Sequence, residues 1–273
     1  MEYKNIESSF NNFRLVRLEK FFIEITNSFT ILWNIFVWIF LIIIKRKKID
    51  KDNLVSQFYE VGVKSLPIIF ITAFSTGMVL ALQLGLVMKS WFGDPIFVGM
   101  SLSFTFAKEL SPILTAIVIS GRIGAAITAE IGTMKVTEQL DAMSSLGVHP
   151  LQYIAIPKFL SCIIMVPILS IFSYIISIIG GLTVATSVLK IPYPIYFADV
   201  FDFVYIKTIL HGLIKAIFFG LIVAWISMYK GFNCEEGAEG VGKATTASVV
   251  LSIILILVSD YFLTSFLIII KIF

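Results

Sequence analysis

Four charged residues occupy a stretch that is otherwise rich in apolar and small side chains. They are Lys108, Glu109, Arg122 and Glu130. A charge at membrane depth costs about 2.5–3.5 kcal/mol or more, so such groups persist where they meet an opposite charge, a wet cavity or a polar substrate. The chemistry that these residue types offer is therefore ion pairing, or contact with a polar molecule, inside a membrane.

The spacing of these charges leaves two interpretations open. Arg122 follows Glu109 by roughly 20 Å of helix, and Glu130 lies about 12 Å further on. Arg122 and Glu130 project about 80° apart, so each could meet a different helix. They are either structural ion-pair partners, with Asp260 of the last apolar run as a candidate, or groups on a substrate path. Lys108 and Glu109 could contact a lipid headgroup or cap the helix.

Small residues recur along the same run and would let another helix approach closely. One row, spaced by four residues, is Ala116, Ser120, Gly124, Thr128 and Gly132. A second row beside it is Gly121, Ala125 and Ala129. Helices in lipid associate through such small-residue faces because no hydrophobic force drives them together. The first row is therefore either an ordinary intramolecular helix contact or the lining of a symmetric dimer interface or central path.

A short amphipathic helix is predicted directly after this run. Val136, Leu140 and Met143 recur at helical spacing, and Gly147 followed by Pro150 marks its end. A helix of about ten residues is marginal alone, so its apolar stripe must dock, either on its own membrane domain or in a groove of a separate motor protein. The candidate docking residues, within 137–146, are Thr137, Glu138, Gln139, Leu140, Asp141 and Met143.

The composition requires a membrane to position these residues. Of 273 residues, 58% are hydrophobic and 14% charged, and the mean hydropathy is +0.95. Soluble chains carry about 25% charged residues. The sequence predicts an all-α polytopic membrane protein with a permease domain over 61–273. Its five expected spans are 61–88, with a kink at Pro67, then 97–134, 154–189, 206–228 and 247–273.

The segments between the spans complete the expected topology. Residues 1–60 are predicted to form an N-terminal tail and an interfacial helix, with 29–44 lying in the membrane plane rather than crossing it. The run 97–134 is too long for one straight crossing, so we expect its first third to lie at the interface or to re-enter. Residues 190–205 are expected to link two spans, and 229–246 to form a flexible Gly-rich loop.

Counting Lys and Arg by side orients the chain. The face formed by residues 1–60, 134–158 and 229–244 carries thirteen of them, against five on the opposite face. Basic residues concentrate on the cytoplasmic side, which places this first face in the cytoplasm or stroma.

Catalysis, metal binding and nucleic-acid binding find no support in the residues. The two histidines, His149 and His211, lie in different segments without metal-ligand spacing. No basic face with interleaved aromatics indicates nucleic acid. The stretch Gly237–Lys243 resembles a phosphate-binding loop, but Ala244 replaces the Ser or Thr that would hold Mg²⁺. We therefore expect no enzymatic activity, no cofactor and no metal in this chain.

The run from Lys108 onward resembles the MlaE family of ABC transporter permeases, and the resemblance covers about residues 60–260. The motifs that carry it are Lys108-Glu109-Leu110-Ser111-Pro112, Gly121-Arg122-Ile123-Gly124, Ala129-Glu130-Ile131-Gly132-Thr133-Met134-Lys135-Val136-Thr137-Glu138-Gln139-Leu140-Asp141-Ala142, Leu146-Gly147-Val148-His149-Pro150 and Pro157-Lys158. The departures from the family pattern are Lys108 and Lys158 where Arg is usual, Ser111 where Gly is usual, and Leu146 where Met is usual.

The resemblance implies a homodimeric permease that moves phospholipids between membranes. Its partners would be two cytoplasmic ATPases, which would bind ATP and Mg²⁺, and a substrate-binding protein with an MCE domain. The segment Thr137–Leu146 would be the coupling helix, and Gly237–Lys243 would face the ATPases. Lys108 and Glu109 would border an outward lipid cavity.

A stand-alone secondary transporter or channel is the alternative, with Glu109, Arg122, Glu130 and Asp260 as ion-coupling groups. The sequence contains no inverted repeat of the kind such transporters use. Of the 21 basic residues 17 are Lys, and about one residue in six is Ile. This bias favours a plastid inner envelope over a bacterial inner membrane as the location.

Overall fold

The computed structural model describes residues 26–37, 51–95 and 97–270. The chain divides into two units, Met1–Lys48 and Ile49–Phe273. In the first unit residues 26–37 are helical. The predicted tail up to residue 25 and the end of the predicted interfacial helix, 38–44, lie outside the described residues.

Every regular element of the second unit, within the described ranges, is helical. The elements are α2 (Lys51–Val61), η1 (Val63–Ser65), α3 (Leu66–Phe92), α4 (Val98–Thr105), η2 (Phe106–Leu110), α5 (Ser111–Ile119), η3 (Ser120–Gly124), α6 (Ala125–Val136), α7 (Gln139–Ser145), η4 (Leu151–Ala155), α8 (Ile156–Ser187), α9 (Tyr193–Phe203), α10 (Ile206–Phe232) and α11 (Gly237–Ile269). Of the short elements, η1 is a 3₁₀ turn and the other three are π-helical.

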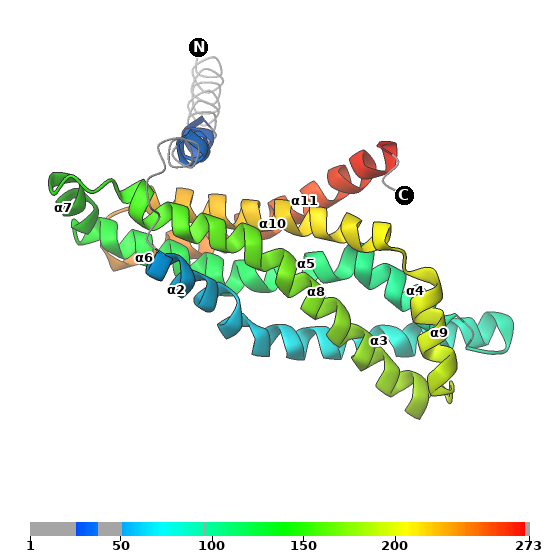
Figure 1. Cartoon of the computed structure of the whole chain (residues 1–273). Coiled ribbons are helices and arrows are strands. Elements are labelled where there is room, and N and C mark those ends of the chain that lie inside the picture. The colour runs from blue at the N-terminus through cyan, green and yellow to red at the C-terminus, as the bar shows by residue number, and fades with distance from the viewer. Residues whose placement is uncertain (1–25, 38–50, 96, 271–273) are drawn as a thin grey trace, which may run out of the picture. The chain divides into compact units, whose positions relative to one another are not determined.

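Five helical runs are long and apolar enough to cross a membrane, which confirms the predicted all-α polytopic class. They are Lys51–Phe92, Val98–Val136, Leu151–Ser187, Ile206–Phe232 and Gly237–Ile269. Helix α7 joins the second and third spans at one end of the bundle, and α9 joins the third and fourth at the other end (Figure 1). We refer to these as the α7 end and the α9 end.

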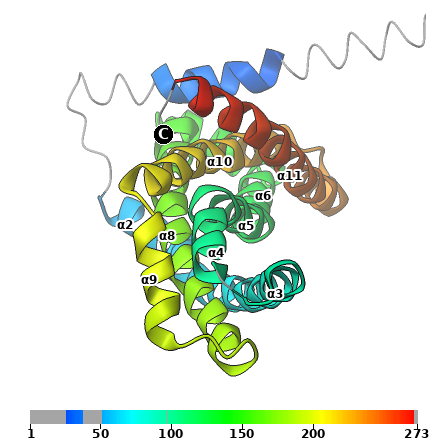
Figure 2. The same cartoon turned by 90° about the vertical axis from the view of Figure 1, so that its right-hand side faces the viewer.

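The second span is the central element of this unit. Its α5 segment contacts α3, α8, α10 and α11, and Figure 2 shows the α4–α6 run among these helices. The expectation that its first third re-enters is wrong, because the 39 residues form one continuous helical run. Two π-helical segments, η2 and η3, interrupt its regular pitch. Such segments are rare in proteins, and those that occur often lie at functional sites.

The first span breaks just before the proline that was expected to kink it. The 3₁₀ turn η1 separates α2 from α3, and Pro67 lies in the first turn of α3. A proline is tolerated there because its missing N–H has no intrahelical partner in any case. The polar stretch before the break, expected to be outside the span, is the helix α2.

Two glycines bring α3 and α8 into backbone contact. A Cβ atom at Gly77 would lie 2.1 Å from the Ser177 carbonyl oxygen, and one at Gly180 would lie 2.3 Å from that of Phe74. Ser177 Oγ also donates a hydrogen bond to the Ala73 carbonyl at 3.1 Å. Neither glycine accepts a side chain without separating the two helices.

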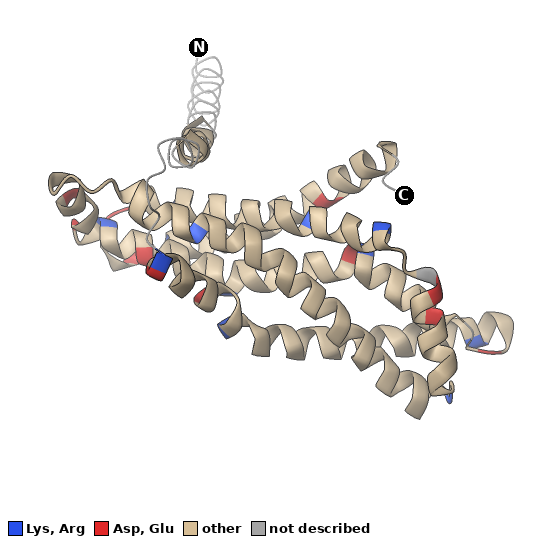
Figure 3. Cartoon of the chain, viewed as in Figure 1, with Lys and Arg blue, Asp and Glu red and all other residues tan. Residues whose placement is uncertain are grey.

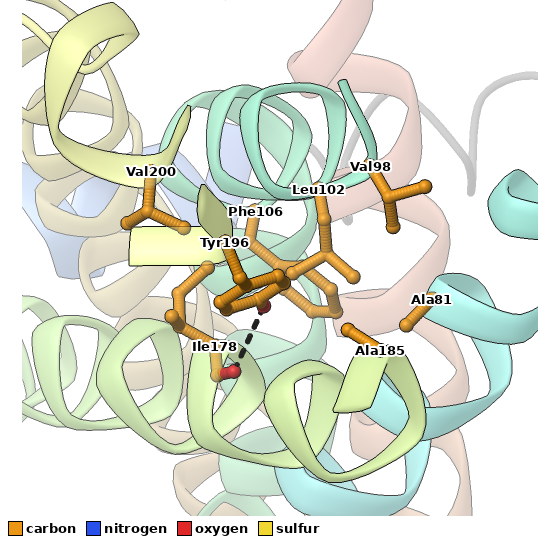
Figure 4. Packing of buried hydrophobic residues seen from close by; sticks show 8 residues of the cluster. All are labelled: Ala81, Val98, Leu102, Phe106, Ile178, Ala185, Tyr196 and Val200. Atoms are coloured by element: carbon orange, nitrogen blue, oxygen red, sulfur yellow. Dashed lines mark hydrogen bonds between the residues drawn. The ribbon is translucent and has the colours of Figure 1, made fainter. Parts of the chain in front are cut away.

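The predicted link at 190–205 contains a helix, α9, that packs against the bundle. Its Tyr196 is fully buried, and the hydroxyl donates to the Ile178 carbonyl at 3.0 Å. The surrounding apolar cluster, shown in Figure 4, is Ala81, Val98, Leu102, Phe106, Ile178, Ala185, Tyr196 and Val200. Burial raises the pKa of Tyr196. Tyr196 and Val200, one turn apart, therefore anchor α9 on α4 and α8.

The packing of α9 is expected to weaken as pH rises. Burial, reinforced by the charge of Asp202, raises the pKa of Asp199 on this helix. The folded state thus favours the protonated acid. The free energy that protonated Asp199 contributes to folding is fully present below the ordinary carboxyl pKa. It is lost as pH rises through the raised pKa of Asp199. Replacement of Asp199 by Asn should remove this pH dependence from the thermal unfolding of the full chain.

Asp202→Asn is the matched control for that measurement. The charge of Asp202 is the second cause of the raised pKa of Asp199. This variant should therefore reduce the pH dependence of thermal unfolding without abolishing it. An Asp199→Asn protein with the pH dependence of the wild type would contradict the assignment.

The predicted loop at 229–246 is wrong for most of its length. A short turn follows α10, and helix α11 already begins at Gly237, which has a φ of 84°. A Cβ atom at Gly132 of α6 would lie 3.4 Å from the Val241 side chain, so the first turns of α11 pack closely on α6. This contact outweighs the low helix propensity of glycine, about 1 kcal/mol per residue relative to alanine.

Candidate functional site

A buried lysine joins two carboxylates from different spans. Lys215 of α10 is 0% exposed. Its Nζ lies 2.8 Å from Asp260 Oδ1 of α11 and also pairs with Glu109 Oε2 of η2. Lys215 lies about 14 Å along α10 from its first residue, well inside the span. We call these three residues the ion cluster. Figure 3 shows how few charged positions interrupt the spans.

Two further polar groups adjoin the ion cluster. Lys108, next to Glu109 in η2, is 9% exposed, and its Nζ lies 5.2 Å from the centre of the Phe104 ring. His211 precedes Lys215 by one turn of α10 and is 1% exposed. The region thus combines two ammonium groups, two carboxylates and an imidazole, and so offers both signs of charge to a polar molecule.

The ion cluster is a costly arrangement inside a membrane. One ammonium faces two carboxylates, whose side chains are 30% and 19% exposed while that of Lys215 is 0% exposed. Burying charges costs several kcal/mol per ion, and the mutual attraction repays this only when the geometry is good. A group of charges kept at this depth is therefore a candidate functional site.

Lys215 is a functional candidate that was not predicted from the sequence. It is a charge in the interior of the apolar run Ile206–Phe232, which is itself the signal that could have found it. The structure also gives Asp260 a partner other than the one expected: Lys215, rather than Arg122.

Glu130 pairs with a lysine near the α7 end of the bundle. Lys158 Nζ of α8 donates to Glu130 Oε2 at 2.7 Å and to Gln57 Oε1 of α2 at 3.3 Å. Lys158 is 4% exposed, whereas the Glu130 side chain is 47% exposed. Glu130 therefore bridges the second and third spans, and its ionic partner is Lys158 rather than Arg122.

Arg122 bonds to the break in the first span. Its Nη1 donates to Ser65 Oγ at 2.6 Å and to the Glu60 carbonyl at 3.2 Å. The Ser65 hydroxyl in turn donates to the Val61 carbonyl at 2.6 Å. Arg122 thus satisfies backbone and hydroxyl acceptors where η1 interrupts the helix, which gives this intramembrane arginine a structural role.

Removing Arg122 should loosen the joint between α2 and α3. Arg122→Met deletes both hydrogen bonds, and hydrogen bonds from a charged donor are worth about 1.5–3 kcal/mol each. Thermal unfolding of the full chain should show the loss, and hydrogen exchange should rise in 58–66. Arg122→Lys keeps the charge but loses the planar guanidinium. Its stability and hydrogen exchange should lie between those of the wild type and Arg122→Met. An Arg122→Met protein with wild-type stability and exchange would contradict this role.

The first row of small residues packs inside the chain, as one of its two interpretations proposed. Ala116, Ser120 and Thr128 are fully buried. Thr128 Oγ1 donates to the Ser227 carbonyl at 3.0 Å and to Ser248 Oγ at 2.9 Å, on α10 and α11. Gly124 and Gly132 are buried as well. This row therefore does not line a dimer interface or a central path. The second row is more open, and a Cβ at Gly121 would have no neighbour within 4 Å.

The predicted docking helix is shorter than expected. Helix α7 covers only Gln139–Ser145, because Glu138 adopts a left-handed conformation with φ of 60°. Thr137 ends α6, and Val136 belongs to α6, so the expected stripe is divided between two helices. Leu140 is only 9% exposed, which indicates that it packs within its own chain.

Other apolar side chains extend into solvent next to α7. Leu146 is 81% exposed and Val148 is 40% exposed, on either side of Gly147 with φ of 77°. Glu138, Gln139 and Asp141 are also exposed. We call Glu138–Val148 the α7 tip.

Among the described residues no group of three His, Cys, Asp or Glu is arranged to hold a metal ion. The stretch that resembled a phosphate-binding loop is the first turns of α11.

Comparison with known proteins identifies the class. The chain is 38% identical over 217 residues to a probable ABC transporter permease protein of Synechocystis sp., covering 80% of this chain and 82% of that protein. It is 39% identical over 226 residues to a probable ABC transporter permease protein of Pyropia yezoensis, covering 83% and 86%. Five membrane-spanning helices and these relatives define a membrane-embedded permease subunit, which is not itself an enzyme.

The family is narrower than this class. The model of the MlaE permease family matches residues 54–266, so the chain belongs to that family. It is also 37% identical over 213 residues to the intermembrane phospholipid transport system permease protein MlaE of Haemophilus influenzae, covering 78% of this chain and 81% of that protein. The resemblance noted in the sequence is thereby confirmed.

Proposed function

We propose that this permease moves phospholipids between membranes and that a separate cytoplasmic ATPase drives it. The ion cluster of Lys215, Glu109 and Asp260 is the observation that carries the proposal. It places both signs of charge at membrane depth. A phospholipid headgroup carries a phosphate and often an ammonium, so both signs match it. The H. influenzae relative is named for intermembrane phospholipid transport.

On this proposal Lys108 and Glu109 form the entrance to the path. Both lie in η2, in the half of the second span nearer the α9 end. Lys108 supplies a cation for a phosphate, and the ion cluster adds one ammonium and two carboxylates. Arg122 and Glu130, with their structural partners, support the first and third spans beside the path rather than forming part of it.

The homodimer of the proposal would form along α11. This span is the least buried of the five, with 17% of its most apolar 18-residue stretch buried. Near the α7 end it presents a shallow hollow lined by Glu239, Gly242, Lys243, Thr246, Ala247 and Val250. A two-fold contact uses the same patch on both copies, and the small residues here permit close helix approach.

Gly242→Leu tests this dimer seam, with Gly121→Leu as the matched control. A Cβ at either glycine would have no neighbour within 4 Å in the chain, so both variants should fold. We expect Gly242→Leu to reduce the dimeric fraction measured by the mass of the detergent-solubilised protein, and Gly121→Leu to leave it unchanged. The reverse result would move the seam to the second span.

A second protein, with an MCE domain, would deliver or receive the lipid at the α9 end. Helix α9 presents large apolar side chains there, with Tyr193, Ile195 and Phe201 more than half exposed. The plastid inner envelope remains the favoured location, on the compositional bias and the similarity to the Pyropia yezoensis relative. A bacterial inner membrane is the alternative.

The test of function is transfer of a fluorescent phospholipid between vesicles that contain the permease with its co-purified partners. ATP should accelerate the transfer, and a non-hydrolysable analogue should not. Transfer by the purified permease without an ATPase, driven by an ion gradient, would support the stand-alone transporter instead.

A further inference from the structure

A cavity lies beside the ion cluster and is separate from it. It has a volume of about 200 Å³ and is lined by residues of η2, α5, α8 and α10. The lining residues are Ala107, Ser111, Ser170, Ile171, Tyr174, Ile175, Ile209, Gly212 and Leu213. Its size compares with an apolar cavity of about 150 Å³ that binds benzene in another protein.

The cavity opens towards the hydrocarbon of the membrane. Ile171 and Ile175 at its edge are 40% and 49% exposed. They belong to a stripe of α8 that continues to Ile164 and Ile179, which are 44% and 42% exposed, as expected for a lipid-facing side. Leu213 lies about 11 Å along α10 from its first residue. The cavity therefore faces the leaflet on the α9 side.

The hydroxyl of Ser111 in this apolar wall has no partner within the described residues. Ser111 Oγ is buried, with the residue 1% exposed, and makes no hydrogen bond within the described residues. The nearby Tyr174 hydroxyl is already engaged by Ser103 Oγ at 2.6 Å. A buried hydroxyl without a partner carries a desolvation cost of about 1–3 kcal/mol. A ligand that brings one acceptor would remove that cost.

We propose that this cavity binds the upper part of one acyl chain of a bilayer phospholipid, with the Ser111 hydroxyl donating to the ester carbonyl. The aliphatic walls match the methylene segment, and the unpartnered hydroxyl of Ser111 matches the ester carbonyl. A water molecule fits less well, because it needs two to four polar partners. The bound chain contacts Ala107 and Ser111, which flank Glu109 in sequence, and so braces the segment that holds the ion cluster.

Photolabelling of the full chain in phosphatidylcholine vesicles tests the site. The probe is a diester phosphatidylcholine with a diazirine on an upper acyl carbon, and mass spectrometry locates the adducts. Adducts should concentrate at Ile171, Ile175 and Leu213 over Ile164 and Ile179, the exposed residues on either side. n-Hexane, an aliphatic competitor for the cavity, should reduce the first set to the level of the second. Equal labelling of both sets, unaffected by hexane, would overturn the proposal.

The hydrogen bond is tested by pairing a variant with a matched lipid. A diether probe lacks the ester carbonyl, so its labelling of the cavity should fall about fivefold, the worth of one hydrogen bond. In Ser111→Ala, which has no donor, diester and diether probes should label equally. A diester preference that persists in Ser111→Ala would show that the carbonyl is bound elsewhere. Cross-links between two copies of the chain at Ile171 would overturn the lipid as occupant.

Ser111→Leu provides a second route, because the larger side chain fills the cavity. It should abolish the labelling that hexane displaces in the wild type. Thermal unfolding in the same vesicles, with and without hexane, accompanies it. The wild type should gain stability from hexane and the variant should not, and an equal gain in both would contradict binding in this cavity.

Discussion

Replacing Lys215 with Met is expected to destabilise the permease strongly. The variant leaves Glu109 and Asp260 without their shared cation inside the membrane. Removal of one partner from a buried ion pair costs about 3–5 kcal/mol, because the remaining charge is uncompensated. Thermal unfolding of the full chain should register this loss. The exposed pair Lys64–Glu60, about half exposed, provides the control: Lys64→Met should change stability by about 1 kcal/mol or less.

A charge-free version separates stability from function. The triple variant Lys215→Met, Glu109→Met, Asp260→Leu replaces all three charges of the ion cluster with hydrophobic side chains of similar volume. Replacing a complete buried ion group by hydrophobic residues of similar volume is often neutral or stabilising. We therefore expect stability close to the wild type but no ATP-dependent phospholipid transfer. Full transfer by the triple variant would show that the ion cluster serves only the fold.

Changing the α7 tip is also expected to have a large effect, on assembly rather than on folding. Leu146→Glu places a charge where an 81% exposed leucine would meet an apolar groove of the ATPase. A residue at the centre of such an interface contributes about 2 kcal/mol or more, and 2 kcal/mol corresponds to about a thirtyfold loss of affinity. The ratio of ATPase to permease after co-purification measures it.

Two comparisons sharpen that experiment. Charge reversal of Glu138 and Asp141 should also weaken the association, since both are exposed on the same tip. Val188→Glu introduces the same charge at a residue that is 57% exposed at the α9 end, and it should leave the ratio unchanged. If the ratio is unaffected in Leu146→Glu and in the charge-reversed variant, the α7 tip is not the coupling site.

The spans were predictable from the sequence because length and hydropathy are local properties. Each observed span nevertheless extends, at one end or both, past the apolar run that predicted it. Helix α11 begins ten residues before the expected position, at Gly237 rather than Ala247, because packing on α6 orders a glycine-rich segment. Helix α9 was hidden because its anchors, Tyr196 and Val200, become informative only once their neighbours on α4 and α8 are known.

The charged residues were recognisable, but their partners were not. A pair such as Lys215 and Asp260 joins residues 45 positions apart, and the sequence does not say which spans are neighbours. The α7 stripe failed for a different reason. The left-handed conformation of Glu138 costs a non-glycine residue roughly 1–2 kcal/mol. The spacing of apolar residues does not reveal such a backbone conformation, so the sequence predicted a continuous helix where the chain turns.

The glycine contacts between α3 and α8 bear on which parts of the bundle move together. Backbone atoms pressed against each other at Gly77 and Gly180 leave no room for sliding, and Gly212 and Gly220 join α10 to η2 and α8 in the same way. Helix α11 is attached differently, through side chains: Val241 packs on Gly132, Thr128 bonds to Ser248, and Asp260 pairs with Lys215. The other four spans would then form one rigid body that moves relative to α11. Cysteine pairs across α6–α11 should cross-link at rates that change with ATP, whereas pairs across α3–α8 should not.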